Sequence, residues 1–293
     1  MNTDYKELAM YLANRMYKWF EKEAGYKDKK DYKAVIGISG GKDSAVAAAI
    51  ACEAIGKENV YGVLMPNGEQ ADIEDSKKVC RFLDIKWGVC KIDGPYVAML
   101  AALNVSDADI RDREKWWNPD KFESDTRVTT NLPARLRMCA LYSIAARING
   151  RVIGTGNFSE AIAGYTTLWG DSACDYNPLA RLYADEVVEV GRALGDLPEE
   201  VLSKPPSDGM SGKTDEDNLG FTYAELKAVM TGCNNVMTSH ENLMSLPNST
   251  RIMERIQASA FKRRLLIGIP HPSVERQTGG AIDMVRTMDA WNK

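Results

Sequence analysis

The sequence lacks several patterns that would point to common classes of protein. It has no apolar run of about 18 residues, the length that a membrane-spanning helix needs. It has only two histidines, His240 and His271, and its six cysteines are scattered without a C-x-x-C pair. These absences argue against a membrane helix and against a histidine- and cysteine-based metal centre. They favour free thiols in a reducing compartment.

The charge balance argues against nucleic-acid binding, and the start of the chain argues against a signal peptide. The net charge of -4 and the isoelectric point near 5.5 leave no excess of basic residues for binding nucleic acid. The first 26 residues are amphipathic and carry acidic side chains among the basic ones, unlike a secretory signal peptide. We therefore expect a cytoplasmic protein that binds neither nucleic acid nor a membrane.

Strand and helix patterns alternate through the first half of the chain. This alternation predicts βαβ units and a parallel sheet. The expected fold class is α/β, a doubly wound parallel sheet with a helical C-terminal part, in a single domain over residues 1–293. The expected strands are 32–39, 59–66, 85–93 and 151–154, the expected helices are 42–55, 70–84, 95–104, 129–148, 222–230 and 249–266, and loops are expected at 106–127 and, as a mobile lid, at 203–220.

The stretch 35–50 joins an apolar strand, a glycine turn and an alanine-rich helix, which predicts a phosphate-binding loop. Two common phosphate loops are absent. The Walker A pattern fails because Ile36 stands where its first glycine belongs and Asp43 stands where its serine or threonine belongs. The Rossmann pattern fails because the turn lacks G-x-G-x-x-G. The remaining pattern is S-G-G-x-D-S, from Ser39 to Ser44.

Each residue type in this loop suits a polyphosphate. The two glycines allow the backbone to approach an anion, and the hydroxyls of Ser39 and Ser44 can donate to it. Lys42 can offset negative charge. Asp43 would repel a phosphate, so we interpret it as a ligand for Mg²⁺, which carboxylates and substrate phosphates commonly hold together. The alternative is a strand-turn-helix corner with an incidental aspartate.

A second carboxylate follows the strand at 151–154, in the stretch GTGNFSE. Loops that follow neighbouring parallel strands face each other at the point where strand order reverses. If the strands that end near Ser39 and Gly154 are neighbours, Glu160 can share a metal ion with Asp43. The alternative is that Glu160 only begins a helix, near its positive end.

The loop resembles that of the ATP-pyrophosphatase superfamily, whose members cleave ATP between the α and β phosphates. The order and spacing of the later motifs are similar to those of the NAD synthetase family, over about residues 10–273. These motifs are ARLRM at 134–138, GTGNFSE at 154–160, GYTTLWGD at 164–171, CDYNPL at 174–179, KPPS at 204–207 and TDEDNLGF at 214–221.

The resemblance implies an enzyme, an NAD synthase, that amidates deamido-NAD through an acyl adenylate and releases AMP and pyrophosphate. It implies Mg²⁺ and ATP, and a homodimer with the dinucleotide site at the subunit interface. Members that use glutamine carry a separate nitrilase-like domain, which this chain has no room for, so ammonia is the expected nitrogen donor. Neither chemical step needs a protein nucleophile, so no catalytic residue is expected.

The resemblance also implies roles for individual residues. Leu168, Ala184 and Phe261 stand where many members have two lysines and a histidine. The cations available to replace the two lysines are Lys42, Arg181 and Lys262. Arg137 is expected to pack, and Lys213 is a candidate phosphate contact. ATP is assigned to Gly37, Ile38, Ser39, Gly40, Gly41, Lys42, Asp43, Ser44, Thr155 and Ser207, deamido-NAD to Arg135, Asp175 and Lys262, and Mg²⁺ to Asp43 and Glu160.

Two other functions remain open at this point. One is a different adenylating ATP pyrophosphatase, for example a tRNA-modifying enzyme, although such enzymes favour a basic surface and often paired cysteines. The other is a nucleotide-binding homologue that has lost catalysis.

Overall fold

The computed structural model describes residues 3–69, 73–103, 122, 124–204, 214–234 and 240–263. Its contacts divide the chain into two compact units. The first unit comprises Met1–Asn157 and Thr166–Thr214, and the second comprises Phe158–Tyr165 and Asp215–Lys293. No helix of the described residues is long and apolar enough to cross a membrane.

The first unit is built on a parallel sheet in the order β3-β2-β1-β4. Strands β1 and β4 are neighbours, since Ala34 pairs with Arg151 and Ile36 with Ile153, which meets the condition for the loops after them to face each other. The strand order reverses between them, because the chain moves outward from β1 to β3 and then returns to the other side of β1. The strands are β1 (Ala34–Gly37), β2 (Val60–Leu64), β3 (Lys86–Val89) and β4 (Arg151–Ile153).

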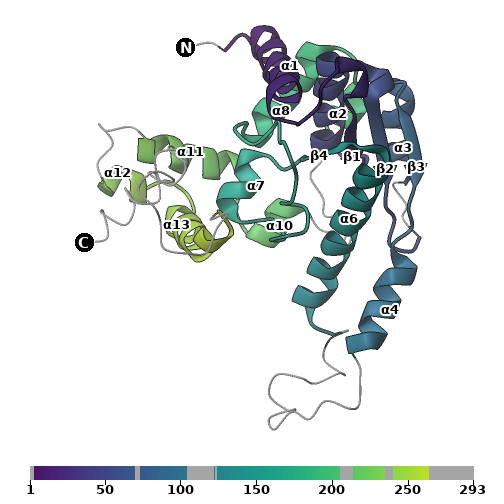
Figure 1. Ribbon diagram of the computed structural model, residues 1–293. Helices are drawn as coiled ribbons and strands as arrows, with labels where there is room; N and C mark the ends of the chain where they lie inside the picture. Colours follow the sequence, from purple (N-terminus) through teal and green to yellow (C-terminus); the bar gives the residue numbers. More distant parts are fainter. Residues whose placement is uncertain are drawn as a thin grey trace. The chain divides into compact units, whose positions relative to one another are not determined.

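Helices cover both faces of this sheet, as a doubly wound fold requires (Figure 1). One face carries α1 (Tyr5–Lys22), α2 (Lys42–Ile55), α3 (Ile73–Phe82) and α8 (Ala184–Leu194), whose buried side chains share one core with β1 and β2. The other face is covered by α6 (Thr126–Ile148), which packs Leu141 and Ala145 against Val35 and Val152. The described residues of this unit also form α4 (Asp93–Leu103), which packs beside α6, and α9 (Glu199–Leu202).

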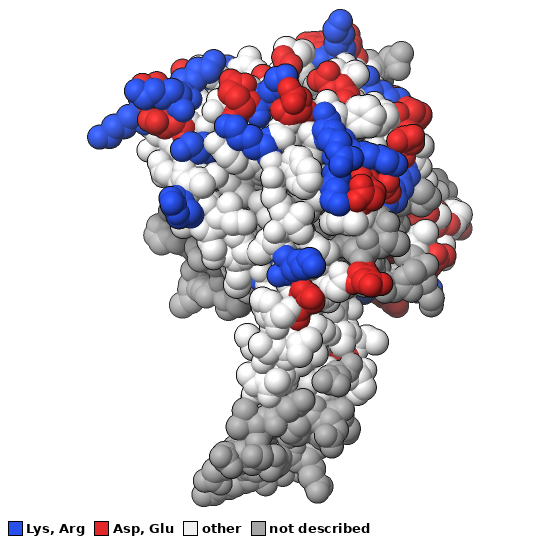
Figure 2. Space-filling model, turned by 90° about the vertical axis from the view of Figure 1, so that its right-hand side faces the viewer, with Lys and Arg blue, Asp and Glu red and all other residues white. Residues whose placement is uncertain are grey.

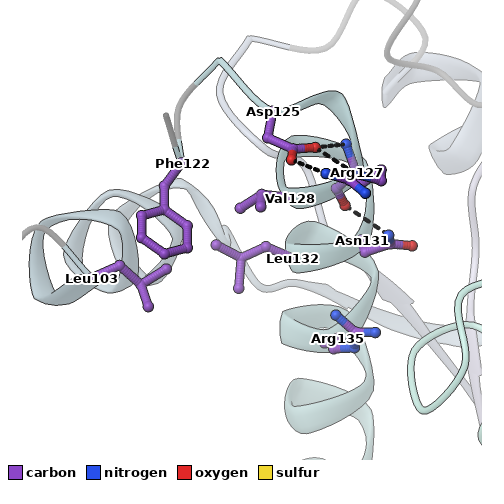
Figure 3. Close-up of a pocket in the computed structure, with 8 residues that line it drawn as sticks. All are labelled: Leu103, Phe122, Asp125, Arg127, Val128, Asn131, Leu132 and Arg135. Carbon is purple, nitrogen blue, oxygen red and sulfur yellow. Dashed lines mark hydrogen bonds and ion pairs between the residues drawn. The ribbon is translucent and has the colours of Figure 1, made fainter. Parts of the chain in front are cut away.

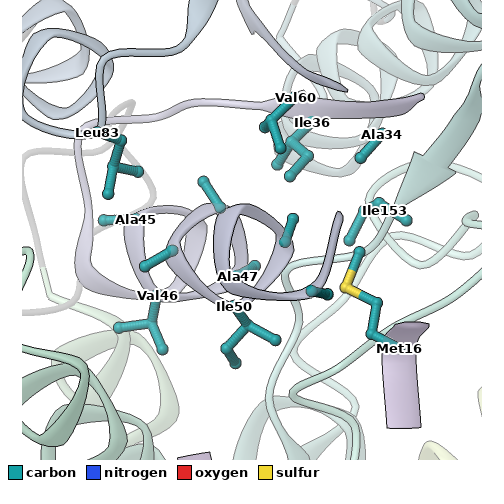
Figure 4. Close-up of a cluster of buried hydrophobic side chains, with 14 of the residues drawn as sticks. Met16, Ala34, Ile36, Ala45, Val46, Ala47, Ile50, Val60, Leu83 and Ile153 are labelled. Atoms are coloured by element: carbon teal, nitrogen blue, oxygen red, sulfur yellow. The ribbon is translucent and has the colours of Figure 1, made fainter. Parts of the chain in front are cut away.

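The alanine-rich sequence of α2 explains its central place in the core. Small side chains allow the helix to lie between the sheet and two other helices, and Ala45 to Ala51 are all buried. In Figure 4, Ile36 and Val60 lie on the sheet side of α2, while Val46 and Ile50 on α2 point away from the sheet. A side chain on Gly191 would meet Val46 at 2.8 Å, so glycine permits the close approach of α8.

The long helix α6 begins earlier than the sequence pattern indicates. Asp125 is its N-cap and accepts a hydrogen bond from the backbone N–H of Arg127 at 2.8 Å. The cap lies inside the expected loop 106–127, of which residues 106–121 and 123 lie outside the described residues. The helix ends at Ile148, and its C-cap Asn149 adopts the left-handed conformation that asparagine tolerates.

The second unit is helical in its described part. It contains α7 (Phe158–Ala163), α10 (Asp215–Leu219), α11 (Tyr223–Asn234), α12 (His240–Met244) and α13 (Ser249–Ala258), followed by the short 3-10 helix Ala260–Arg263. The prediction of one helix over 249–266 was wrong at its C-terminal end. Ser259 ends α13, because its hydroxyl bonds back to the carbonyl of Ile256 and also accepts from Arg263.

Candidate active site

The loop between β1 and α2 is braced by its own serines. The backbone N–H of Ser39 donates to Oγ of Ser44 at 3.2 Å, and the N–H of Gly41 donates to Oγ of Ser39 at 3.3 Å. Gly41 is the N-cap of α2 and has no side chain with which to cap the first turn. The N–H groups of that turn and the positive end of the helix therefore suit an anion, as the sequence predicts.

The loop needs glycine at position 40 for two reasons. Gly40 has a φ of +80°, in the left-handed region that favours glycine. A Cβ atom there would lie 2.8 Å from the backbone nitrogen of Ser76 and 3.0 Å from Cβ of Asp75. The first turns of α3 thus lie directly against the phosphate loop.

We expect Gly40→Ala to destabilise the protein more than Gly68→Ala, which is a matched control. Gly68 has a similar φ of +78°, but no atom of the described residues lies within 4 Å of its Cβ position. Both changes carry the cost of the left-handed conformation, about 1 to 2 kcal/mol, whereas only the first adds a backbone clash worth about 1 to 3 kcal/mol more. Urea unfolding measures the difference. Equal stability of the two variants would contradict the tight packing of the loop on α3.

Asp43 lies in the first turn of α2, and a different group contacts each of its oxygens. The amide Nδ2 of Asn157 donates to Oδ1 at 3.1 Å, and Nζ of Lys42 donates to Oδ2 at 2.9 Å. Asn157 is 1% exposed and follows β4, so the loops after β1 and β4 do face each other. Our sequence reasoning did not assign Asn157, although it stands inside the GTGNFSE motif.

The carboxylate of Asp43 is a ligand type that fits Mg²⁺. This ion is commonly held by one or two carboxylates together with substrate phosphates, and Asp43 lies in the first turn of the helix whose N-terminus suits an anion. No group of three or more His, Cys, Asp or Glu residues is gathered as a metal cluster in the described part of the chain. Glu160, in the first turn of α7, belongs to the second unit, so its sharing of one ion with Asp43 stays a prediction.

Arg135 and Arg137 point to different surroundings, as their spacing along α6 predicts. Arg135 is exposed, and its Nε donates to the carbonyl of Leu168 at 3.3 Å. Arg137 is half-buried, and its Nε donates to the carbonyl of Met65, just beyond β2, at 3.0 Å. This contact fits the packing role expected of Arg137 and leaves Arg135 as the arginine that a ligand can reach.

Arg135 also lines a pocket of about 390 Å³ between the end of α4 and the beginning of α6 (Figure 3). Apolar side chains gather on one side of it, and Asn131 and Arg135 lie on the other side. Asn131 is itself bonded to Thr167, whose hydroxyl donates to its Oδ1 at 2.7 Å. The lining residues are Leu103, Phe122, Asp125, Arg127, Val128, Asn131, Leu132 and Arg135.

Asp175 is held by two donors from different elements. The hydroxyl of Tyr142 on α6 donates to Oδ1 at 3.2 Å, and the N–H of Val152 on β4 donates to Oδ2 at 2.8 Å. Its expected contact with the substrate stays a prediction. The sequence pattern does not single out Tyr142, because it is one aromatic residue on a long helix.

The thiol of Cys174, the residue before Asp175, is poorly suited to nucleophilic chemistry, since burial raises its pKa to about 11.

The other expected site residues fall into three groups. Thr155 is half-buried in the loop after β4. Lys262 lies in the second unit, where its Nζ donates to the carbonyl of Gly164 at 2.8 Å, and its expected contact with the substrate stays a prediction. Ser207 and Lys213 lie outside the described residues.

One ion pair connects the beginning of the expected lid to the phosphate loop region. Lys204 donates to Oδ2 of Asp75 at 2.9 Å, and Asp75 belongs to the turn of α3 that lies against Gly40. The hydrogen bond from Lys204 holds the pKa of the Asp75 carboxyl below its ordinary value. Of the expected loop at 203–220, residues 205–213 lie outside the described residues, and residues 215–219 form the helix α10.

The sequence and the fold of the chain are similar to those of known proteins. The NAD synthase family profile matches residues 12–266. The chain is 37% identical to the NH(3)-dependent NAD(+) synthetase of Thermococcus kodakarensis over 240 residues, 80% of this chain and 87% of the relative. The structure of NMN synthetase from Francisella tularensis is 32% identical in sequence, with a TM-score of 0.71. The aligned residues cover 92% of this chain and 100% of the NMN synthetase chain. The NH3-dependent NAD synthetase from Campylobacter jejuni is 27% identical, with a TM-score of 0.66, over 92% of this chain and 100% of its own.

Proposed function

The chain belongs to the NAD synthase family, and on that premise we propose that it makes NAD from deamido-NAD, ATP and ammonia. The observation that carries the proposal is the phosphate loop between β1 and α2, whose Asp43 is held by Asn157 from the loop after the neighbouring strand. Ammonia is the proposed nitrogen donor because curated relatives that the chain matches over most of their length are named NH(3)-dependent.

In the proposed first step, the carboxylate of the substrate attacks the α-phosphorus of ATP. A P–O bond forms to the carboxylate oxygen, the bond to the β-phosphate breaks, and pyrophosphate leaves. The serine hydroxyls and the N–H groups at the beginning of α2 bind the phosphates and stabilise the charge that develops on them. Mg²⁺ held by Asp43 and Glu160 would neutralise further charge on the phosphates when it is bound.

In the proposed second step, ammonia attacks the carbonyl carbon of the acyl adenylate. A C–N bond forms, the C–O bond to AMP breaks, and one proton leaves the nitrogen. The chain supplies no nucleophile in this scheme, and positioning accounts for most of the rate. A lid over residues 203–220 would protect the adenylate from water.

We place the carboxylate-bearing end of the substrate near Arg135. Its guanidinium can bind a carboxylate or a phosphate with two parallel hydrogen bonds. The pocket that Arg135 lines combines apolar side chains with polar groups, which suits an aromatic ring attached to a charged sugar phosphate.

We propose that the enzyme is a homodimer, with a second copy covering the exposed apolar surface near β3 and α4. Trp87 and Val89 on β3 are 40% and 47% exposed, and Val97 and Met99 on α4 are 63% and 43% exposed. Figure 2 looks onto the side of the molecule that carries β3 and α4. Light scattering at micromolar concentration is expected to give twice the mass of one chain, and a monomer would contradict this interface.

The cytoplasm is the proposed location. All six cysteines are unpaired thiols in the structure, as in most proteins of reducing compartments.

Two alternative functions are a nucleotide-binding homologue that has lost catalysis and an enzyme that adenylates a different acid. The assay that tests the main proposal also tests both alternatives.

The deciding experiment incubates the purified chain with deamido-NAD, ATP, Mg²⁺ and ammonium. We expect pyrophosphate, AMP and NAD in equal amounts, measured by a pyrophosphate-coupled assay and by mass spectrometry. Glutamine in place of ammonium should give no product. Orthophosphate instead of pyrophosphate would contradict the site chemistry, and binding of both substrates without AMP formation would favour a protein that has lost catalysis.

A second candidate substrate is nicotinic acid mononucleotide, and one observation favours it. The NMN synthetase structure from Francisella tularensis superposes with a TM-score of 0.71, against 0.66 for the NAD synthetase of Campylobacter jejuni. The same assay with the mononucleotide decides between the two. A higher kcat/KM for the mononucleotide would make amidation of the mononucleotide the main activity.

A further inference from the structure

Lys42 occupies an unusual position for a cation. It is the first residue of α2, where the helix dipole favours anions, and it is only 6% exposed. Burial of a charge is unfavourable unless a group of opposite sign accompanies it. Asp43 is such a group, because the ammonium Nζ of Lys42 lies 2.9 Å from its Oδ2.

The same carboxylate is the group that fits Mg²⁺. Asn157 holds Oδ1 of Asp43, and Lys42 contacts Oδ2. The side chain of Asp43 is 19% exposed, so water screens charges near it weakly. A divalent cation bound to this carboxylate would therefore repel the ammonium of Lys42 if the ammonium stayed in place.

We propose that Lys42 is an exchangeable counterion of Asp43. Without nucleotide, its ammonium neutralises the carboxylate and opposes binding of a divalent cation. When ATP occupies the phosphate loop, the ammonium turns to a phosphate oxygen and Oδ2 becomes available to the cation. Nucleotide and cation are thereby taken up together. The proposal rests on the proposed function in one respect, since it requires ATP in this loop.

The first test measures Mn²⁺ binding to the full chain without nucleotide, from the electron paramagnetic resonance signal of free Mn²⁺. We expect Lys42→Gln to bind Mn²⁺ about tenfold more tightly than the unmodified chain, because it removes the competing charge. Lys42→Arg keeps the charge and should stay within about twofold. Lys57→Gln is the matched control, since Lys57 pairs with Asp84 at 2.8 Å on the surface, where both side chains are more than half exposed.

The second test adds an ATP analogue with a methylene group between the α and β phosphates. We expect the analogue to raise the Mn²⁺ affinity of the unmodified chain more than that of Lys42→Gln. The gain in Lys42→Gln should disappear when Asp43→Asn is added, because both effects act on one carboxylate. If Lys42→Gln does not fold by circular dichroism, Lys42→Met replaces it, since methionine keeps the apolar part of the side chain.

Two results separate this proposal from the proposed function. An Mn²⁺ affinity that is unchanged in Lys42→Gln, while the analogue binds normally, overturns the counterion role alone. A gain that persists in the double variant with Asp43→Asn overturns it as well. Failure of every variant and of the unmodified chain to bind the analogue would instead refute the proposed function.

Discussion

Replacing Asp43 by asparagine is expected to lower kcat for pyrophosphate release by about 1,000-fold, the largest effect of any single change considered. The substitution keeps the size of the side chain and its bond with Asn157, but it removes the negative charge that pairs with the buried Lys42 and that would hold Mg²⁺. The KM for deamido-NAD should change little, because Asp43 acts on ATP. Initial-rate kinetics with varied ATP and deamido-NAD measure both quantities.

Asp84→Asn is the matched control for this change. Asp84 also pairs with a lysine, Lys57, but lies on the surface and far along the chain from the loop, so its loss should leave kcat unchanged. Glu160→Gln should resemble Asp43→Asn if both carboxylates hold one ion. If the rate of Glu160→Gln stayed within a few fold of that of the unmodified chain, Glu160 would not hold the ion and would only begin the helix α7.

The sequence predicts the fold around the phosphate loop well, because local patterns determine it. The helix over 42–55 agrees with α2 at both ends, since the glycine turn and Gly56 set its limits. The parallel sheet follows from the alternation of strands and helices, whereas the sequence left open whether β1 and β4 are neighbours, which their pairing shows. In this part of the molecule, turn residues and hydrophobic pattern lead to the same structure.

The candidate site was less predictable, because its supporting contacts join distant parts of the chain. Asn157 reaches Asp43 across 114 positions of sequence, and Tyr142 reaches Asp175 across 33. Neither spacing leaves a periodic signal. The early start of α6 was missed for a different reason. Its N-cap, Asp125, lies in a polar stretch that reads as a loop until the cap itself is recognised.

Arg135→Ala is expected to lower kcat/KM for deamido-NAD by about 100-fold, mainly through KM. A charge-assisted hydrogen bond contributes about 1.5 to 3 kcal/mol, and a guanidinium that binds an anionic group with two such bonds loses both on truncation. Arg135 is exposed at the pocket, and the one hydrogen bond that its guanidinium makes to the described residues runs from Nε to the carbonyl of Leu168. Steady-state kinetics with each substrate varied in turn measure the effect.

Two further variants test whether the effect depends on the guanidinium of Arg135 itself. Arg135→Lys should recover part of the affinity, because it restores the charge but not the planar pair of donors. Arg137→Ala lies two residues further along α6 and removes the bond to the carbonyl of Met65, so it should lower stability by about 1 kcal/mol with little effect on KM. If Arg135→Ala and Arg137→Ala raised the KM equally, the loss would come from disturbance of α6, and Arg135 would not be the residue that binds the substrate.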